Sequence, residues 1–391
     1  MKALFVTHSF PRFEGDSAGS FILGLAVALG KQNVEVRVVA PSAPGLRDTG
    51  VIEGIAIRRF RYAPRSRETL AYRGTMSEDV SRSIAGKLAL ASFIVAETAS
   101  VRAEVSKWKP DVIHAHWWFP NGVVAATISR LSGVPLVTTS HGTDLRLLQQ
   151  HSGARPLARY VFGGSKRVTC VSQWLADQAA AFSASAPIVA PMPVAASRFH
   201  SGSDRDGNRI VFVGRLTAQK GIEVAIRALA LLRRSVVLDV IGDGPDRAML
   251  TELARQLGLS ERVLWRGQVR HGEVPALLAR ASALVAPFTD EGLGLVAVES
   301  QLCETPPVAF ASGGLVDVIE NEVTGLLVPP GDTAALAAAL ERVVTNPALR
   351  DRLGAAGRAA ALNRFTPQAV GERYARIYTD AIAARTDERA R

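Results

Sequence analysis

Residues 209–221 read Arg-Ile-Val-Phe-Val-Gly-Arg-Leu-Thr-Ala-Gln-Lys-Gly. The β-branched and aromatic run at 209–213 predicts a buried strand, Gly214 ends it, and a helical pattern begins after the last glycine. A strand that leads through a short glycine-containing loop into a helix is the unit from which parallel α/β sheets are built. This loop also carries two cations, Arg215 and Lys220.

The alternation of strands and helices continues on both sides of this unit. It predicts parallel strands covered by helices on both faces, so the expected fold class is α/β with two doubly wound, Rossmann-like domains. The expected strands are 2–7, 34–40, 111–115, 134–139, 167–171, 209–213, 236–241, 262–265 and 283–286. The expected helical regions are 21–29, 78–108, 273–280, 293–303 and 367–385, with others beginning at 221, at 245 and after the capping residue Asp332.

The boundary between the two domains is expected in a stretch that lacks either pattern. Residues 184–208 contain three prolines and then a polar run, which is typical of a linker. A chain of 391 residues also exceeds the ~250–300 residues that one core usually supports. The sequence therefore predicts two domains joined near residues 190–207.

The composition excludes several classes of protein. Hydrophobic residues make up 48% and charged residues 21%, as in globular proteins, and no run of about 18 apolar residues lacks a charge. Two cysteines are too few for a disulfide framework or a thiolate metal site. The N-terminus becomes polar too soon for a signal peptide. We therefore expect a cytoplasmic protein that is neither secreted nor integral to a membrane.

The net charge of +10, from 46 Lys and Arg against 36 Asp and Glu, favours anionic partners. The densest basic run, residues 58–67, has little aromatic interleaving and lies in no nucleic-acid-binding module, so we expect no nucleic-acid partner. Peripheral contact with an anionic inner membrane stays open as an alternative use of this charge.

In open α/β sheets, ligands bind at the carboxyl ends of the strands, where helices present N–H groups and positive dipole ends. Arg215 and Lys220 lie at such a place. A cation just before a helix is unfavourable by roughly a few tenths of a kcal/mol, unless an anion is bound there. A diphosphate would balance both charges, and we favour this anion site over an exposed loop with two solvated cations.

Two further strand ends carry residues suited to a ligand. Residues 242–245, Gly-Asp-Gly-Pro, either let the backbone approach a flat ligand or form a simple tight turn. Residues 289–299 place Glu291 at a turn and Glu299 about two helical turns later. These carboxylates either bind hydroxyls of one extended ligand or are a first-turn dipole partner and a solvated side chain.

These segments together resemble the retaining glycosyltransferases of family 4, which have the GT-B fold of two Rossmann-like domains facing across a cleft. The resemblance covers nearly the whole chain. Its motifs are Asp-Val-Ile-His-Ala-His at 111–116, Ser-His-Gly-Thr-Asp at 140–144, Gly-Arg-Leu-x-x-x-Lys-Gly at 214–221, Gly-Asp-Gly-Pro at 242–245, Arg-Gly-x-Val at 266–269, Glu-Gly-x-Gly-Leu-Val-x-x-Glu at 291–299, Gly-Gly-Leu at 313–315 and Thr-Gly-Leu-Leu-Val-Pro-Pro-Gly-Asp at 324–332.

The resemblance implies a division of labour between the domains. Residues 1–190 would bind the acceptor and residues 191–365 the donor, and the C-terminal helix 366–391 would pack back on the first domain. The donor would be a nucleotide-diphosphate sugar linked to UDP or GDP. The acceptor would be a hydroxyl of a sugar or of a lipid-linked molecule, in the synthesis of a polysaccharide, glycolipid or other cell-envelope glycoconjugate.

The resemblance also implies a role for each matching donor-side residue. Arg215 and Lys220 clamp the diphosphate, Glu299 holds the ribose hydroxyls, and Glu291 holds hydroxyls of the transferred sugar. Backbone around Val269 contacts the base. The other implied donor-side positions are Gly214, Gly242, Gly292, Leu293, Gly294, Leu295 and Val296, the last two through their N–H groups.

On the acceptor side, His141 matches the family's histidine beside the sugar and completes a catalytic set with Arg215, Lys220 and Glu291. His141 follows the strand 134–139, at the edge where ligands bind. Its alternative role is to cap a loop, and we favour the functional one.

Four other first-domain residues carry expectations. His114 and His116 flank Ala115 at a strand end, and we expect one to be a buried core residue and His116 to face the acceptor. Asp144 and Gly19 are further acceptor-side candidates. The loop 15–19, Gly-Asp-Ser-Ala-Gly, replaces the Gly-Gly pair of many family members, and Asp16 would repel a diphosphate if it pointed inward.

The family's proposed reaction is front-face: the leaving phosphate takes the acceptor's proton as the bond breaks, and the anomeric configuration is retained. It uses no dedicated general base, and we expect no cofactor. Asp204-Arg205-Asp206 resembles the metal-binding triplet of the other glycosyltransferase fold, but it lies in a polar linker, so we also expect no metal.

Two rival functions share the pattern. A nucleotide-sugar epimerase of the same fold would convert the donor without an acceptor. A non-catalytic nucleotide-sugar-binding protein would keep the fold but would have no need of His141, Arg215, Lys220 and Glu291 together. A dehydrogenase is less favoured because no Gly-x-Gly-x-x-Gly follows the first strand.

Overall fold

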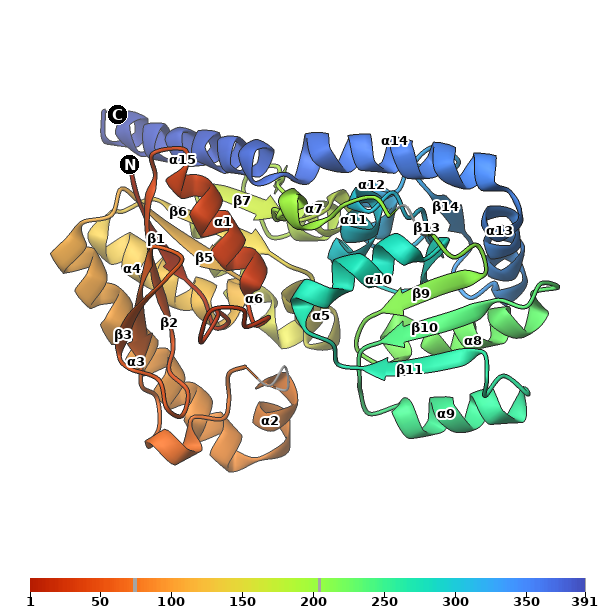
Figure 1. The fold of residues 1–391 in the computed structure, drawn as a ribbon. Helices are drawn as coiled ribbons and strands as arrows, with labels where there is room; N and C mark the ends of the chain where they lie inside the picture. The colour runs from red at the N-terminus through yellow and green to blue at the C-terminus, as the bar shows by residue number, and fades with distance from the viewer. Residues whose placement is uncertain (73–75, 203–204, 391) are drawn as a thin grey trace. The chain divides into compact units, whose positions relative to one another are not determined.

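The computed structural model describes residues 1–72, 76–202 and 205–390, and it divides into two compact units (Figure 1). Unit 1 consists of Met1–Pro193 and Pro367–Arg391, and unit 2 consists of Val194–Thr366. Each unit is built around its own sheet, and the alternation of strands and helices in the sequence predicts this layout.

Unit 1 contains an eight-stranded sheet in the order β3-β4-β2-β1-β5-β6-β7-β8. All of its neighbouring strands are parallel except β3 and β4. The strands are β1 Lys2–Val6, β2 Glu35–Pro41, β3 Thr49–Ile52, β4 Ile55–Phe60, β5 Val112–His116, β6 Leu136–Ser140, β7 Arg167–Cys170 and β8 Ile188–Val189. The helices are α1 Ser20–Gly30, α2 Met76–Arg82, α3 Ile84–Trp108, α4 Val123–Ser132, α5 Thr143–Gln150, α6 Arg155–Gly164, α7 Gln173–Ala180 and α15 Pro367–Ala390.

Unit 2 contains a six-stranded, all-parallel sheet in the order β11-β10-β9-β12-β13-β14. The strands are β9 Arg209–Val213, β10 Val237–Ile241, β11 Val263–Gly267, β12 Ala283–Ala286, β13 Pro307–Phe310 and β14 Leu326–Val328. The helices are α8 Ile222–Leu231, α9 Arg247–Gln256, α10 Val274–Arg280, α11 Leu295–Leu302, α12 Leu315–Val318, α13 Thr333–Thr345 and α14 Pro347–Phe365.

The structure refines the expected elements at several places. The expected helical region 78–108 is interrupted at Ser83, which is extended and caps α3 by accepting a hydrogen bond from the N–H of Gly86. The strands β3, β4, β8, β13 and β14 lie in stretches where the sequence predicted no strand. Asp332 caps α13 by accepting from the N–H of Ala335 at 2.8 Å, which confirms that expectation.

The C-terminal helix α15 belongs to unit 1 and packs against α1 (Figure 1). Two of its tyrosines, Tyr374 and Tyr378, are fully buried. The hydroxyl of Tyr374 donates to the carbonyl oxygen of Ala190 at 2.9 Å, and the hydroxyl of Tyr378 lies 2.6 Å from Nδ1 of His114 in β5. Because both hydroxyls are partnered, their burial stabilises the docked helix.

Among the described residues, one helix is long and apolar enough to cross a membrane when judged by length and composition alone. This helix is α3, and only 17% of its most apolar 18-residue window is buried within the protein. A core helix of a soluble protein passes the same test when it is mostly buried, which α3 is not.

Replacing Tyr378 with Phe should destabilise unit 1, because Nδ1 of the buried His114 loses its hydrogen-bond partner. An unpaired buried polar group costs about 1–3 kcal/mol, so we expect a loss of that size in the free energy of unfolding, measured by urea titration. The matched control is Tyr160→Phe, since the hydroxyl of Tyr160 bonds Thr127 at a half-buried site. Equal losses in the two variants would contradict this account of α15.

Candidate functional site

The expected donor-side residues of unit 2 lie at one edge of its sheet. Gly214, Gly242, Val269 and Glu291 follow β9, β10, β11 and β12, which are neighbours in the order β11-β10-β9-β12. All four strands are parallel, so their following loops meet at the same edge. The connections leave β9 toward β10 on one side and return to β12 on the other, which makes this edge a topological switch point.

Lys220 and Glu291 form an ion pair at this edge. Nζ of Lys220 lies 2.6 Å from Oε2 of Glu291, and both side chains are about one fifth exposed. The same ammonium lies 4.4 Å from the centre of the Phe288 ring, a cation–π contact. The N–H of Thr289 donates to the carbonyl of Gln219 at 3.0 Å and joins the two loops. Arg215, in contrast, is exposed to solvent.

Two glycine motifs allow these loops to approach one another. A Cβ on Gly242 would lie 2.0 Å from the carbonyl oxygen of Gly214, and a Cβ on Gly313 would lie 2.4 Å from that of Glu291. Both glycines also have positive φ, of 129° and 57°. The backbone N–H of Gly314 donates to the same Glu291 carbonyl at 2.7 Å. Residues 313–314 therefore support the loop that carries Glu291.

The helix α11 presents its N-terminus at the same edge. Gly292 and the buried Leu293 lead into Gly294, which has a φ of 87° and precedes the helix. Leu295 and Val296 occupy the first turn, where backbone N–H groups have no partner within a helix and the dipole is positive. An anion fits this end of α11.

Glu299 lies in the middle of α11 and is half-buried. Burial raises the pKa of its carboxyl to about 7. Because a carboxylate in this position lacks its full hydration, it gains by accepting hydrogen bonds from a ligand's hydroxyl groups.

In unit 1, a cluster of aromatic rings gathers at the carboxyl edge of the sheet. His141 follows β6 and is half-buried, and its Nε2 lies 3.1 Å from Nδ1 of His116 in β5. The two imidazoles stack with their centres 5.3 Å apart. The rings of Trp117 and Phe21 lie 4.6 Å and 5.2 Å from that of His141. These contacts fix the orientation of His141.

The expectation that His116 faces outward is wrong. His114 and His116 are both fully buried, and their ring centres are 4.2 Å apart. Residues two apart on a strand point to the same face, so one of this pair cannot point inward while the other points outward. His116 lies behind His141, and its contact with any ligand is therefore indirect.

The geometry also indicates how His116 orients the proton of His141. Nε2 of His116 is buried without a hydrogen-bond partner among the described residues. Buried N–H groups without a partner are rarer than buried acceptors without one, so we infer that the proton of His116 lies on Nδ1 and is donated to Nε2 of His141. Burial lowers the pKa of His141 to about 3. His141 is thus a neutral imidazole with its own proton on Nδ1.

Asp144 is 4% exposed and supports the loop of His141. One carboxylate oxygen accepts from the N–H groups of His141 at 3.2 Å and Gly142 at 3.0 Å, and the other accepts from the N–H of Trp118 at 3.3 Å. Its carboxylate is therefore directed at the backbone, which makes it a positioning residue.

The structure shows why Asp16, in the loop before α1, does not present a free negative charge to a diphosphate. The carboxylate of Asp16 is ion-paired with Arg12 at 2.6 Å and is buried, so its charge is compensated within the loop. Gly19 has a φ of 67°, and a Cβ there would lie 2.3 Å from the carbonyl oxygen of Ser9. Only glycine fits this approach of α1 to the end of β1.

Sequence reasoning missed two residues of the unit 1 cluster, His8 and Trp117. Their rings lie 4.2 Å apart, and burial lowers the pKa of His8 to about 4. Trp117 has a φ of 66°, which is unusual for a residue other than glycine and is often found at functional sites. Each follows a strand closely, His8 after β1 and Trp117 after β5, and that position was the available signal.

The triplet Asp204-Arg205-Asp206 is described only in part, because Asp204 lies outside the described residues. Arg205 donates to the carbonyl oxygens of Ala281 and Cys303, and Asp206 pairs with Arg209 at 3.2 Å. Both described members are thus used in the structure of unit 2.

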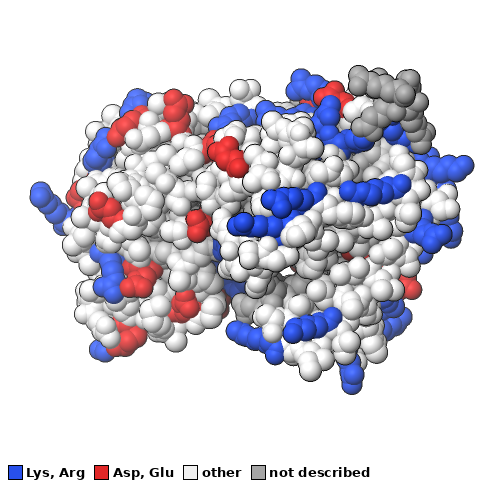
Figure 2. Space-filling model, turned by 180° about the vertical axis from the view of Figure 1, so that it is seen from behind, with Lys and Arg blue, Asp and Glu red and all other residues white. Residues whose placement is uncertain are grey.

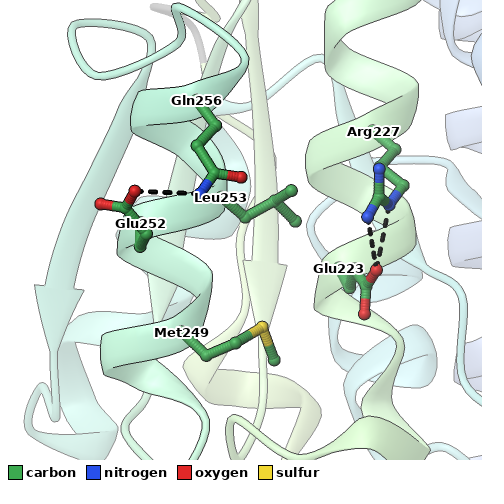
Figure 3. Close-up of a pocket in the computed structure, with 6 residues that line it drawn as sticks. All are labelled: Glu223, Arg227, Met249, Glu252, Leu253 and Gln256. Carbon is green, nitrogen blue, oxygen red and sulfur yellow. Dashed lines mark hydrogen bonds and ion pairs between the residues drawn. The ribbon is translucent and has the colours of Figure 1, made fainter.

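A shallow hollow of about 250 Å³ lies between α8 and α9 (Figure 3). Two hydrogen-bonded pairs, Glu223 with Arg227 and Glu252 with Gln256, occupy its walls. Because these groups already bond one another on exposed helix surfaces, we assign no function to this hollow. Its lining residues are Glu223, Arg227, Met249, Glu252, Leu253 and Gln256.

Comparisons with known proteins identify both halves of the chain. Residues 18–195 match the glycosyl transferase 4-like domain, and residues 194–360 match the family described as glycosyl transferases group 1. Glycogen synthase of Mycobacterium tuberculosis is 33% identical over 310 residues, which cover 72% of this chain and 71% of that protein. A D-inositol 3-phosphate glycosyltransferase of Frankia alni is 34% identical over 313 residues, which cover 69% and 76%.

Solved structures agree in fold. Sucrose-phosphate synthase from Thermosynechococcus elongatus matches with a TM-score of 0.80 at 23% identity, over 98% of this chain and 99% of that one. Anabaena HepE in complex with UDP-glucose matches with a TM-score of 0.72 at 20% identity, over 97% and 99%. The sequence-based expectation of two Rossmann-like domains of the GT-B type is confirmed.

The buried histidines of unit 1 should make its stability depend on pH. The pKa values of His8, His114, His116 and His141 are all lowered by burial, so the unfolded chain binds more protons than the folded one below pH ~6.5. Stability from these groups is present above that pH and is lost as the pH falls. Each contributes a slope of up to ~1.4 kcal/mol per pH unit.

Urea unfolding between pH 7 and 5 measures this slope. In the variant His116→Gln we expect the slope to be smaller by the equivalent of about one bound proton. The buried Glu97 acts in the opposite direction, since burial raises its pKa to about 8. Glu97 is present in both the wild type and the His116→Gln variant, so the difference between their two slopes gives the contribution of His116. Identical slopes would mean that His116 is not a neutral buried group.

Proposed function

The chain belongs to the glycosyl transferases group 1 family, and we propose that it is a retaining hexosyltransferase that moves a hexose from a nucleotide-diphosphate sugar to a hydroxyl acceptor. The observation that carries this proposal is the Lys220–Glu291 ion pair beside the N-terminus of α11. This pair supports the proposal because a cation suited to phosphate and a carboxylate suited to hydroxyls then lie at one sheet edge with the N–H groups of α11.

We propose that the donor's diphosphate takes the place of Glu291 as the partner of Lys220. Lys220 and the exposed Arg215 then neutralise the diphosphate, and the N–H groups of Leu295 and Val296 bind its oxygens. Glu291, released from the ion pair, accepts hydrogen bonds from hydroxyls of the hexose. The ion pair thus holds both side chains in place before the donor arrives.

The nucleoside would lie beyond the diphosphate along the same edge. We propose that Glu299 accepts hydrogen bonds from the ribose hydroxyls and that backbone around the half-buried Val269, after β11, contacts the base. HepE, which has this fold, has been solved in complex with UDP and with UDP-glucose, which supports a uridine or related nucleotide as donor.

For the reaction, we propose front-face transfer with retention. The bond between the anomeric carbon and the phosphate oxygen breaks while the acceptor hydroxyl attacks from the same face, and its proton passes to the leaving phosphate oxygen. No separate base is needed for this proton balance. His141 is neutral because burial lowers its pKa to about 3, so it serves as a hydrogen-bond donor through Nδ1 and not as a proton source.

Unit 1 would supply the acceptor side of the reaction. We propose that His141 contacts the hexose, that Asp144 and His116 position His141, and that the acceptor is a sugar or lipid-linked hydroxyl. A role in cell-envelope glycoconjugate synthesis on the cytoplasmic side fits a positively charged protein, because anionic phospholipids and phosphorylated acceptors are both attracted by a net charge of +10.

The proposal is tested by incubating the protein with a panel of UDP- and GDP-hexoses. The expected results are a raised melting temperature with the correct donor and slow release of the nucleotide and the free hexose. Proton NMR should show that the hexose appears first in the donor's own anomeric configuration. An inverted anomer would overturn retention, and conversion of the donor to an epimer without release of nucleotide would favour the epimerase.

Replacing Lys220 with Ala should weaken binding of UDP or GDP about 10- to 100-fold, since a hydrogen bond to a charged group contributes ~1.5–3 kcal/mol. Isothermal calorimetry with the nucleotide preferred in the panel measures this. Lys31→Ala, at an exposed position after α1, is the control and should bind as the wild type does. Unchanged affinity in Lys220→Ala would remove Lys220 from the donor site.

Nucleotide affinity should also depend on the protonation of Glu299. The pKa of this carboxyl is raised to about 7, and the ribose hydroxyls require the deprotonated acceptor, so affinity should rise about tenfold from pH 6 to pH 8. Glu299→Gln should lose this component of the pH dependence. Titration of the nucleotide's own phosphate affects both proteins alike, so the ratio of their affinities is the measurement. A constant ratio would exclude contact between Glu299 and the ribose.

A further inference from the structure

The helix α3 carries an apolar stripe on its solvent side. Ile84, Leu88 and Val95 are 77%, 66% and 70% exposed, and Ala91 and Ala99 are also exposed. The spacing of these five residues, four, three, four and four, keeps them on one line along the helix. We call this line the α3 stripe. A surface helix normally directs polar side chains at water, so the α3 stripe requires an explanation.

The opposite side of α3 is fixed in unit 1. Phe93 packs against the rings of Phe60 and Tyr62, with centres 4.8 Å and 5.2 Å apart. Glu104, near the end of the helix, pairs with Arg58 at 3.1 Å and with Arg37 at 3.6 Å. Because these contacts join α3 to β2 and β4, the helix stays in the domain and presents the stripe to whatever covers it.

The net positive charge of the protein comes from unit 1, which carries this stripe. Unit 1 has 27 Lys and Arg against 17 Asp and Glu, a net of +10, whereas unit 2 has 19 of each, a net of zero. On the face that Figure 2 shows, the charged side chains over unit 1 are mainly Lys and Arg, while both signs are mixed over unit 2. Unit 1 therefore attracts an anionic partner.

Cations also accompany the stripe itself. Arg102 continues its line by one further step of three residues, and Lys87 lies one residue before Leu88, both exposed. Long basic side chains beside an apolar line can reach phosphate groups while their stems lie along the apolar surface. An apolar stripe with flanking cations is the pattern of a helix that lies in the interface of an anionic membrane.

We propose that the α3 stripe docks the protein on an anionic lipid bilayer, with Ile84, Leu88 and Val95 entering the headgroup region and Lys87 and Arg102 contacting lipid phosphates. This inference deepens the membrane contact in the proposed function by assigning the surface and orientation. It does not depend on the donor site, since α3 belongs to unit 1 and the donor residues to unit 2.

Cosedimentation of the full-length protein with vesicles tests the proposal. Vesicles of phosphatidylcholine with 30% phosphatidylglycerol should bind the protein, pure phosphatidylcholine should bind it weakly, and 0.5 M NaCl should reduce the binding. The double variant Leu88→Glu/Val95→Glu should partition at least about tenfold less. The matched control is Leu231→Glu, at a 56% exposed position on α8 of unit 2, which should bind as the wild type does.

A fluorescent label tests the orientation. Both native cysteines, Cys170 and Cys303, are buried, so Leu88→Cys provides an exposed thiol for an environment-sensitive dye. The dye at position 88 should shift to the blue on anionic vesicles, and the dye on the control Leu231→Cys should not. Vesicle binding without this shift would mean that another surface docks, which overturns the proposal.

Two further outcomes also overturn it. In the first, the double variant binds vesicles as well as the wild type does, which would show that the stripe is not the docking surface. In the second, light scattering shows that the wild type is a dimer and the double variant a monomer, which would mean that the stripe contacts a second copy of the chain. Calorimetric nucleotide binding by the double variant should equal that of the wild type, so a failed membrane proposal and a failed donor site are distinguished.

Discussion

Parallel strands deliver their following loops to one edge of a sheet, and both candidate sites depend on this constraint. Lys220 and Glu291 are 71 positions apart in the sequence, yet their charged atoms are 2.6 Å apart because β9 and β12 are neighbours. His116 and His141 are 25 positions apart and meet because β5 and β6 are neighbours. Strand order therefore decides which side chains meet, and the loops decide their chemistry.

One ion pair in each unit compensates charges near these edges. Lys220 pairs with Glu291 in unit 2, and Arg12 pairs with Asp16 in unit 1. The partners Lys220 and Glu291 are each about one fifth exposed, and an ion pair with such access to water contributes only about 0–1 kcal/mol. In the proposed donor complex, a diphosphate of higher charge would therefore replace the glutamate at small cost. The pair orders the site without closing it to a ligand.

Most of the fold was predictable because its strands are short apolar runs that end at glycine or polar residues. The strands β3, β4, β8, β13 and β14 were not predicted. In β4, Ile55–Phe60 includes Arg58 and Arg59, within a run that the sequence indicates only as basic. Arg59 is 6% exposed, and its guanidinium donates to the carbonyl oxygen of Pro11 and to the hydroxyl of Tyr72. Hydrogen bonds to neutral groups thus allow a cation inside the domain, which composition does not indicate.

The candidate site was predictable to different degrees in the two units. Strand-end motifs indicated Lys220 and Glu291 individually, but not that they pair with each other before any ligand binds. In unit 1, the contacts of His141 with His116 and Trp117 bring together loops that share no local pattern. Predicting where these side chains point also required the two-residue period of a strand, by which His114 and His116 lie on the same face.

The distribution of charge separates two roles that the net value of +10 conceals. A nucleotide donor is itself an anion, but unit 2, which carries the candidate donor site, has no net charge. In the proposed donor site, the anion is instead bound by local groups, namely Arg215, Lys220 and the N-terminus of α11. We propose that the excess of cations in unit 1 serves a different anion, because unit 1 also contains the apolar stripe of α3. A positive field and an exposed apolar line are both costly to a protein in water unless one partner, such as a lipid surface, satisfies them together.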